Sequence, residues 1–343
     1  MELATRTQAD LTVLIPAFRD TFIEDAVGSC LQQNILPSSI IISDDSPNNL
    51  VIKRLQTRKD ILYTAKECGV NIQLLEGPKR GVTCNLFALN ALWNKKTEYY
   101  HLLLDDDVIM PEFYQTHLAN FTRLNLLGSV SSRCLIDENG EVTGIPALPD
   151  MVTKLSGIGV VVPSEFLFKT VFQPALATNW LGETSNALFH KDSADIMFGR
   201  AEGSIRSTPG LGDISLFLEL GARERLGYTH QYLGGFRQHS NQHTSGKASE
   251  ILFFGYADWI TLARNMLKHE RIPEDVSQSI VENHMNVLFS NQEKFSAFPT
   301  LKPFFDLLWD LKNPKACADF DQKWQVALSA YFYDLDVLGK NMN

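Results

Sequence analysis

The sequence predicts an α/β protein in which a Rossmann-like, mostly parallel mixed sheet is flanked by helices and followed by a C-terminal helical extension. Strand and helix patterns alternate through the first third of the chain, as in βαβ units. With 343 residues, 44% of them hydrophobic and 21% charged, the chain has the composition of a globular protein. From about Ser249 onward the apolar residues recur only at helical spacing.

The first expected strand, residues 11–18, is a nearly all-apolar run, which is typical of a parallel strand that is buried on both faces. The later elements follow from apolar spacing and from the Gly, Pro and Asp residues that end each run. They are a helix within residues 21–33, strands at 38–46 and 71–78, a helix within 81–95 and a strand at 98–107.

The expected strands end in residues that suit a binding site. These ends are Pro16-Ala17, Asp44-Asp45, Gly77-Pro78 and Asp105–Asp107. In open parallel sheets, ligands bind outside the carboxyl ends of the strands. The sequence therefore predicts one crevice that is lined by all four strand ends.

The three consecutive acids Asp105, Asp106 and Asp107 lie between apolar segments, so their mutual repulsion needs an explanation. One interpretation is a solvated turn that ends near Pro111. The other is a divalent cation such as Mg²⁺ or Mn²⁺, which prefers carboxylate oxygens and usually takes only one or two of them together with substrate phosphates. Local sequence leaves both open, and the convergence of strand ends favours the cation.

Charge and cysteine content exclude several classes of protein. The net charge is −9 and no cluster of Lys and Arg is present, which argues against a nucleic-acid partner. The five cysteines are scattered without a CxxC pair, which argues against a disulfide framework and a zinc site and favours the cytoplasm. The N-terminus lacks the pattern of a signal peptide, and no apolar run reaches the ~18 residues of a membrane helix. Peripheral contact with the inner face of a membrane stays open.

We expect two domains, a catalytic α/β domain at residues 1–248 and an α-helical module at residues 249–343. The module carries amphipathic patterns, and Trp324, Leu328 and Tyr331 recur at helical spacing near its end. Such a stripe is more often a packed core than a cofactor site. The module is expected either to pack on the catalytic domain or to serve association.

The order of the motifs resembles that of the family 2 glycosyltransferases, which have the GT-A fold. The resemblance covers about residues 10–245. It rests on Ile15-Pro16-Ala17-Phe18, Asp44-Asp45-Ser46, Gly81 through Asn85, and Asp105–Asp107, in that order. It implies a metal-dependent inverting transfer of a sugar from a nucleoside diphosphate, UDP above all, to a hydroxyl of a glycan or lipid-linked glycan acceptor. The implied pathway is bacterial surface polysaccharide synthesis.

The resemblance also implies roles for the acids and for a histidine. Asp107 corresponds to the ligand of Mn²⁺ or Mg²⁺, and Asp105 to the ribose contact. Asp106 is assigned to the nucleotide site, with a solvated spacer as the alternative. His239, in the stretch "FRQHSNQH", corresponds to the residue that completes the metal shell, and His243 is its rival.

Further positions are implied for the nucleotide. Pro16, Ala17 and Phe18 would frame the base through their backbone, and a carboxylate of Asp44 or Asp45 could accept the imide N–H of uracil. Lys79 or Arg80 would neutralise the diphosphate, although both could be ordinary surface cations. Asn85 is assigned to the nucleotide site and is expected mainly to hold the start of its helix. Contacts to sugar or acceptor are assigned to Trp180, Glu183, Thr184 and Asn186, with a core position as the alternative for Trp180.

Asp213 corresponds to the catalytic base, which removes a proton from the acceptor. The family often has a Glu-Asp pair here, whereas this chain has Gly212 before Asp213. Helix N-capping is the alternative role for Asp213. A base that works near neutral pH needs its pKa raised by burial or by neighbouring acids.

Two other functions compete with this interpretation. A nucleotidyltransferase of sugar-nucleotide metabolism also uses acids and a metal on an α/β sheet, but the Gly- and Lys-rich N-terminal loop typical of such enzymes is missing from this sequence. A noncatalytic glycan- or nucleotide-binding module would be favoured by loss of the Asp triplet or of Asp213, and both are present.

Overall fold

The computed structural model describes residues 6–154, 159–173, 177–198, 210–240, 249–311 and 319–341. The chain divides into two compact units. Unit 1 comprises residues 1–171, 179–207 and 213–239, and unit 2 comprises residues 172–178, 208–212 and 240–343. The domain boundary placed between residues 248 and 249 from the sequence stays a prediction.

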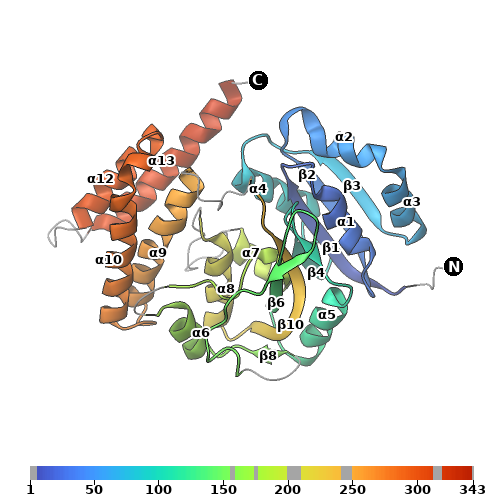
Figure 1. The fold of residues 1–343 in the computed structure, drawn as a ribbon, viewed down its shortest axis with the longest axis horizontal. Helices are drawn as coiled ribbons and strands as arrows, with labels where there is room; N and C mark the ends of the chain where they lie inside the picture. The colour runs from blue at the N-terminus through green and yellow to red at the C-terminus, as the bar shows by residue number, and fades with distance from the viewer. Residues whose placement is uncertain are drawn as a thin grey trace. The chain divides into compact units, whose positions relative to one another are not determined.

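Unit 1 is built on a mixed sheet with the strand order β3-β2-β1-β4-β9-β6-β10-β5 (Figure 1). The strands are β1 (Gln8–Ala17), β2 (Leu36–Asp44), β3 (Asn71–Glu76), β4 (Tyr99–Leu102), β5 (Val108–Ile109), β6 (Gly128–Ile136), β7 (Val142–Gly144), β8 (Val160–Val161), β9 (Ala187–His190) and β10 (Leu226–Arg237). The neighbours β3, β2, β1 and β4 are parallel, β9 is antiparallel to both β4 and β6, and β6 is parallel to β10. The short strand β7 pairs antiparallel with β6, and the short strand β8 pairs antiparallel with β10.

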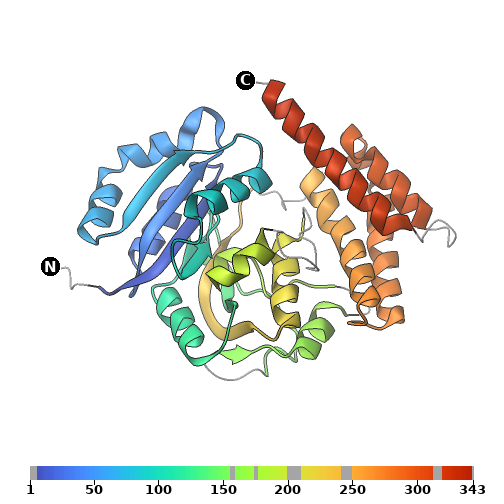
Figure 2. The same cartoon turned by 180° about the vertical axis from the view of Figure 1, so that it is seen from behind.

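Helices cover both faces of the parallel half of this sheet. Helix α1 (Ile23–Leu31) lies before the strands in Figure 1, and α4 (Val82–Trp93) lies before them in the reverse view of Figure 2. The other helices of this part of the chain are α2 (Leu50–Thr57), α3 (Lys59–Glu67), α5 (Phe113–Arg123), α6 (Ser164–Val171), α7 (Ala194–Met197) and α8 (Gly212–Ala222).

Burial explains the apolar runs of the sequence. Every residue of β1 from Leu11 to Ala17 is buried, because helices pack on both faces of this central strand. The outermost parallel strand, β3, has no fully buried residue and alternates between exposed and half-buried positions over its first four residues. Residues of β1, β2, α1 and α5 share one hydrophobic core.

The strand expected at residues 98–107 is shorter in the structure. Strand β4 ends at Leu102, and Asp105–Asp107 lie in the turn between β4 and β5. The three acids still lie at the carboxyl end of the parallel strands, but in a turn that follows β4 and not in a strand with the hydrogen-bond ladder of the sheet.

Unit 2 is mainly helical and has its own aromatic core. Its helices are α9 (Glu250–Lys268), α10 (Glu274–Ser290), α11 (Gln292–Phe295), α12 (Lys302–Leu311) and α13 (Phe320–Asn341). Phe253, Phe254, Phe304 and Trp324 are almost completely buried in one cluster. Within the described ranges, no helix has both the length and the hydropathy to cross a bilayer.

The core of unit 2 generates a test on two residues of α13. Leu328 is 7% exposed within the cluster, whereas Val326 on the same helix is 64% exposed. We expect Leu328→Ala to lower the free energy of unfolding by about 2–5 kcal/mol, because it leaves a cavity. Val326→Ala, the matched control, should change it by less than about 0.5 kcal/mol. Urea titration followed by circular dichroism measures both, and equal effects of the two variants would contradict the packing described here.

Candidate active site

Strand register brings the expected strand ends together. Pro16 and Ala17 of β1 pair with Ser43 and Asp44 of β2, and the amide of Asp45 donates to Ala17 O at 2.7 Å. Asp44 is in turn aligned with the last residue of β3. The end of β4 lies on the other side of β1. The predicted edge therefore exists, with the backbone of Pro16 and Ala17 at its centre.

Asp44 is buried and serves the turn after β2. Its Oδ1 accepts from the amide of Ser46 at 2.8 Å and from the Ser46 hydroxyl at 2.5 Å, and its Oδ2 accepts from the amide of Ile52 at 2.9 Å. The carboxylate thus holds the chain as it enters α2. Its predicted contact with a nucleobase stays a prediction.

Asp45 joins the end of β2 to the loop between β3 and α4. Its oxygens accept from the amides of Lys79 at 2.5 Å and of Gly81 at 2.9 Å. Gly77 makes this approach feasible, because a Cβ at that position would lie 2.7 Å from Asp45 Oδ1. In this structure the carboxylate shapes the loop, and a ligand's N–H would have to share or replace these donors.

The basic and amide residues of the same loop also face protein groups. Lys79 Nζ donates to two backbone carbonyls of the turn after β2, at 2.6 Å each. Asn85 is buried and donates to Ser43 O at 2.9 Å, which agrees with its expected role at the start of α4. Arg80 is half-buried. The roles of these three residues toward a nucleotide stay predictions.

Two acids of the triplet are satisfied by cationic and backbone donors. Asp105 Oδ2 accepts from the amides of Phe18 at 2.6 Å and of Arg19 at 2.7 Å. The Arg19 guanidinium donates to Asp105 Oδ1 at 3.2 Å and to Asp106 Oδ2 at 2.9 Å. His239 Nε2 lies 3.1 Å from Asp106 Oδ2. The sequence interpretation had not given Arg19 a role, because nothing local shows that it folds back onto acids 86 and 87 residues away.

Asp107 differs from its two neighbours. Its Oδ1 accepts from the amide of Arg237 at 3.1 Å, whereas its buried Oδ2 accepts no hydrogen bond of good geometry among the described residues, although the Ser185 side chain lies close enough to act on the carboxylate. Burial, and then the charges of Asp106 and Glu183, raise the pKa of Asp107 well above its usual range. A cation would relieve this electrostatic cost, so Asp107 has the chemistry of a metal ligand.

Arg237 fixes the backbone around the triplet. It is completely buried, and its Nε donates to Asp106 O at 2.8 Å. Its Nη1 donates to Asp137 O and Glu138 O at 3.1 Å each, and its Nη2 donates to Asp25 Oδ2 at 2.9 Å. Arg237 lies two residues before His239, and nothing in the local sequence predicts its structural role.

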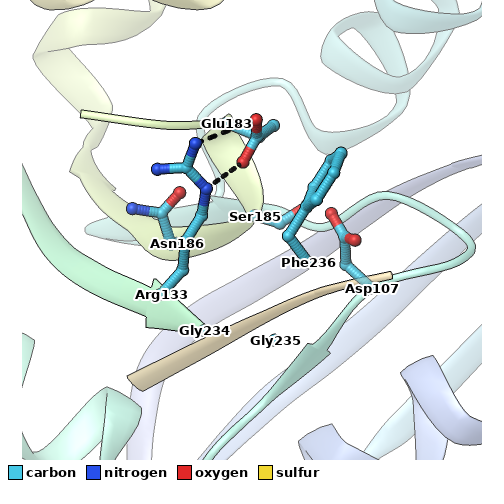
Figure 3. A pocket seen from close by; sticks show the side chains of 8 residues that line it. All are labelled: Asp107, Arg133, Glu183, Ser185, Asn186, Gly234, Gly235 and Phe236. Carbon is cyan, nitrogen blue, oxygen red and sulfur yellow. Dashed lines mark hydrogen bonds and ion pairs between the residues drawn. The ribbon is translucent and has the colours of Figure 1, made fainter. Parts of the chain in front are cut away.

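A small pocket opens beside Asp107 (Figure 3). Its lining residues are Asp107, Arg133, Glu183, Ser185, Asn186, Gly234, Gly235 and Phe236. The Arg133 guanidinium pairs with the Glu183 carboxylate, with Nε 2.8 Å from Oε2. The Asn186 side chain is fixed by its Nδ2, which donates to Ser131 O at 2.6 Å and to Leu181 O at 2.9 Å. Glu183 and Asn186, both expected at the sugar or acceptor, thus lie in the same pocket as Asp107.

Asp213 lies in the first turn of α8, one residue after the helix begins at Gly212. Its Oδ1 accepts from the amide of Ile214 at 2.7 Å, and its Oδ2 accepts from Asn179 Nδ2 at 3.2 Å. Burial, and then the charge of Glu183, raise the pKa of Asp213 to about 7. This pKa suits a group that accepts a proton near neutral pH.

The remaining expected residues lie in different surroundings. The Trp180 indole is 4% exposed, and its Nε1 donates to Thr170 Oγ1 at 3.1 Å, so it packs as a core residue here. Thr184 is half-buried, and Phe18 is 54% exposed at the end of β1. His243 lies outside the described residues.

The described residues contain no group of three or more His, Cys, Asp and Glu side chains arranged to hold a metal ion. His239 Nε2 contacts the Asp106 carboxylate at 3.1 Å. The metal assignments of Asp107 and His239 stay predictions.

Comparison with solved structures identifies similar folds. The chain superimposes on S. aureus TarS residues 1–349 in complex with UDP-GlcNAc with a TM-score of 0.53 and 14% identity, over 91% of this chain and 81% of that one. For the same TarS fragment with UDP, the TM-score is 0.50 and the identity 12%, over 97% and 90%. No protein-family model and no curated protein matches the chain. The predicted GT-A-like α/β fold with C-terminal helices is thereby confirmed.

The raised pKa of Asp213 generates a prediction about stability. Folding raises this pKa from about 4 in an unfolded chain to about 7, so the folded state favours the protonated carboxyl. Its ionisation therefore destabilises the fold progressively as pH rises from about 4 to about 7. Asp213→Asn cannot ionise, so we expect its melting temperature relative to the parent to increase between pH 4 and pH 7.5.

Thermal unfolding at a series of pH values measures this difference. Asp150→Asn, at an exposed position, is the matched control and should keep a constant difference from the parent. A difference for Asp213→Asn that is independent of pH would show that the carboxyl titrates normally.

Proposed function

We propose that this chain is a metal-dependent, inverting glycosyltransferase of the family 2 type, which transfers a sugar from a nucleoside-diphosphate donor to a glycan or lipid-linked glycan hydroxyl. The observation that carries the proposal is that burial, together with the charge of Glu183, raises the pKa of two acids, Asp107 and Asp213. Burial raises the pKa of Asp107 well above its usual range, with no hydrogen bond of good geometry to its Oδ2 among the described residues, and it raises the pKa of Asp213 to about 7. Glu183 raises the pKa of both, so all three carboxylates lie within electrostatic reach of one another.

The choice of donor is supported by the fold. TarS, which this fold resembles, is seen with UDP and with UDP-GlcNAc. We therefore propose a UDP-sugar as the donor. We propose that the nucleotide lies against the strand edge at Pro16 and Ala17 and that the sugar lies near the small pocket beside Asp107, which would have to widen to admit it.

Asp107 is the residue that fits a divalent cation. Mn²⁺ and Mg²⁺ are commonly bound by one or two carboxylates together with substrate phosphates, so a site built on few protein ligands suits them. We propose Asp107 as the principal ligand and His239 as the second. When bound, the cation stabilises as a Lewis acid the negative charge that develops on the leaving diphosphate.

The residues of this chain supply the other parts of the reaction. In a single displacement, the acceptor oxygen forms a bond to the anomeric carbon while the bond from that carbon to the diphosphate oxygen breaks. The acceptor proton passes to the Asp213 carboxylate, and UDP leaves with the electron pair of the broken bond. Arg133 and Glu183 line the pocket in which the sugar would lie.

One prediction from the proposed function concerns the metal. Asp107→Asn keeps the shape of the side chain but removes its charge, so we expect UDP binding to lose its dependence on Mn²⁺ and sugar transfer to fall below detection. Calorimetric titration of UDP, with Mn²⁺ or with EDTA, measures the first effect. Release of UDP from a panel of UDP-sugars measures the second.

Asp150→Asn serves as the control, because Asp150 is exposed. Transfer by the parent that continues undiminished in EDTA would contradict the metal role. A parallel assay with UTP and sugar 1-phosphates separates the competing functions, since release of pyrophosphate there would indicate a nucleotidyltransferase. Binding of UDP-sugars without release of UDP or of pyrophosphate would indicate a noncatalytic module.

Another prediction from the proposed function concerns the base. Asp213→Asn keeps the size of the side chain but cannot accept a proton, so turnover should fall by about 10²–10⁴. Affinity for the UDP-sugar should change little, because the residue acts on the acceptor. For the parent, kcat/KM should rise with pH and level off above about 7, where Asp213 is ionised. A variant with turnover close to that of the parent would exclude Asp213 as the base.

A further inference from the structure

A short turn before η2 (Thr184–Asn186) ties the pocket to Asp213. Asn179 Nδ2 donates to Gly182 O at 2.8 Å and to Asp213 Oδ2 at 3.2 Å. The amide of Gly182 donates back to Asn179 Oδ1 at 3.1 Å. One amide side chain therefore closes the turn and also orients the carboxylate of Asp213.

Gly182 allows the ion pair of Arg133 and Glu183 to lie close to this turn. Its φ is +92°, and a Cβ at this position would lie 2.2 Å from Arg133 Nη1. Only glycine combines this backbone conformation with so close an approach of the guanidinium. Arg133 in turn holds Glu183, the next residue along the chain, at 2.8 Å (Figure 3). The glycine thus lets Arg133 fix Glu183 beside the turn that carries Asn179.

Glu183 and Arg133 are also the charged groups that act on Asp213 among the described residues. Burial contributes most to the raised pKa of Asp213, the charge of Glu183 raises it further, and the charge of Arg133 lowers it. The residue before Asp213 is Gly212, so its immediate neighbour in sequence supplies no acid. The acidic neighbour instead comes from a segment 30 residues earlier in the chain, at Glu183.

We propose that Glu183, held by Arg133, acts as the acidic partner of Asp213, and that the turn from Asn179 to Glu183 positions Asp213 for proton transfer. Asn179, Arg133 and Glu183 are positioning residues in this role, because they act through Asp213. The inference rests on the proposed function, in which Asp213 is the base.

The test compares the titration of Asp213 with the pH dependence of the reaction. The carboxyl carbon of Asp213 is followed by NMR in protein labelled with ¹³C-aspartate and is assigned by its absence in Asp213→Asn. We expect Glu183→Gln to lower the pKa of Asp213 by about one pH unit, because a like charge has been removed. The acidic limb of the profile of kcat/KM against pH should move to lower pH by the same amount.

A second variant shifts the pKa in the opposite direction. Asn179→Ala removes a hydrogen bond to the ionised carboxylate, so the pKa of Asp213 and the acidic limb should both rise. Loss of packing alone would not give opposite shifts at two positions of one turn. Glu141→Gln, at an exposed glutamate, is the matched control and should match the parent in both measurements.

The outcomes separate this inference from the proposed function. An unchanged Asp213 pKa in Glu183→Gln would overturn the inference, whatever the rate. If the NMR pKa falls while the acidic limb of the rate profile stays in place, Glu183 does act on Asp213, but Asp213 is not the base, and the proposed function fails. Should Glu183→Gln not fold, the rise expected for Asn179→Ala still decides the matter, and no rise in that variant would overturn the inference.

Discussion

Three adjacent carboxylates held at a buried strand end are the constraint on which the site depends. Two arginines from distant segments, Arg19 and Arg237, contact the turn that holds these carboxylates. Arg19 donates to the side chains of Asp105 and Asp106, whereas the buried Arg237 donates its side-chain protons mainly to backbone carbonyls and to Asp25. Arg237 thus fixes the geometry of the turn. The two arginines have different roles, and the pKa of Asp107 is still raised well above its usual range.

The acids at the carboxyl edge of the sheet differ in how far protein donors satisfy them. The carboxylate oxygens of Asp44 and Asp45 accept hydrogen bonds from backbone amides. Both residues thereby shape the loops after β2 and β3 and have a structural role. Asp105 is likewise satisfied by amides and by Arg19. Burial nevertheless raises the pKa of Asp105, of Glu183, of Asp107 and of Asp213, so the electrostatic cost of these carboxylates is spread over the site. Asp107 and Asp213 share Glu183 as a neighbour, so a change in charge at one of these acids affects the others.

The sequence predicts those features that depend on local periodicity. The apolar run of β1, the strand ends of β2 and β3 and the helix that begins near Gly81 are all short-range patterns, and the structure confirms them. It could not predict which acids are satisfied, because the partners are remote. Arg237 and Asp25 are 212 residues apart, and nothing in either segment indicates their contact. The same holds for the pairing of Arg133 with Glu183, which depends on the register of β6 beside η2.

The raised pKa of Asp107 is the strongest structural argument for function. A buried carboxylate oxygen without a well-placed donor costs free energy, and a fold can tolerate it only where surrounding contacts determine the geometry. The described hydrogen bonds of the Arg237 guanidinium go to backbone carbonyls and to Asp25, while its backbone amide donates to Asp107. Burial still raises the pKa of Asp107, so its ionised form costs free energy beside the pocket. A cation that the substrate's phosphates can share would lower this cost.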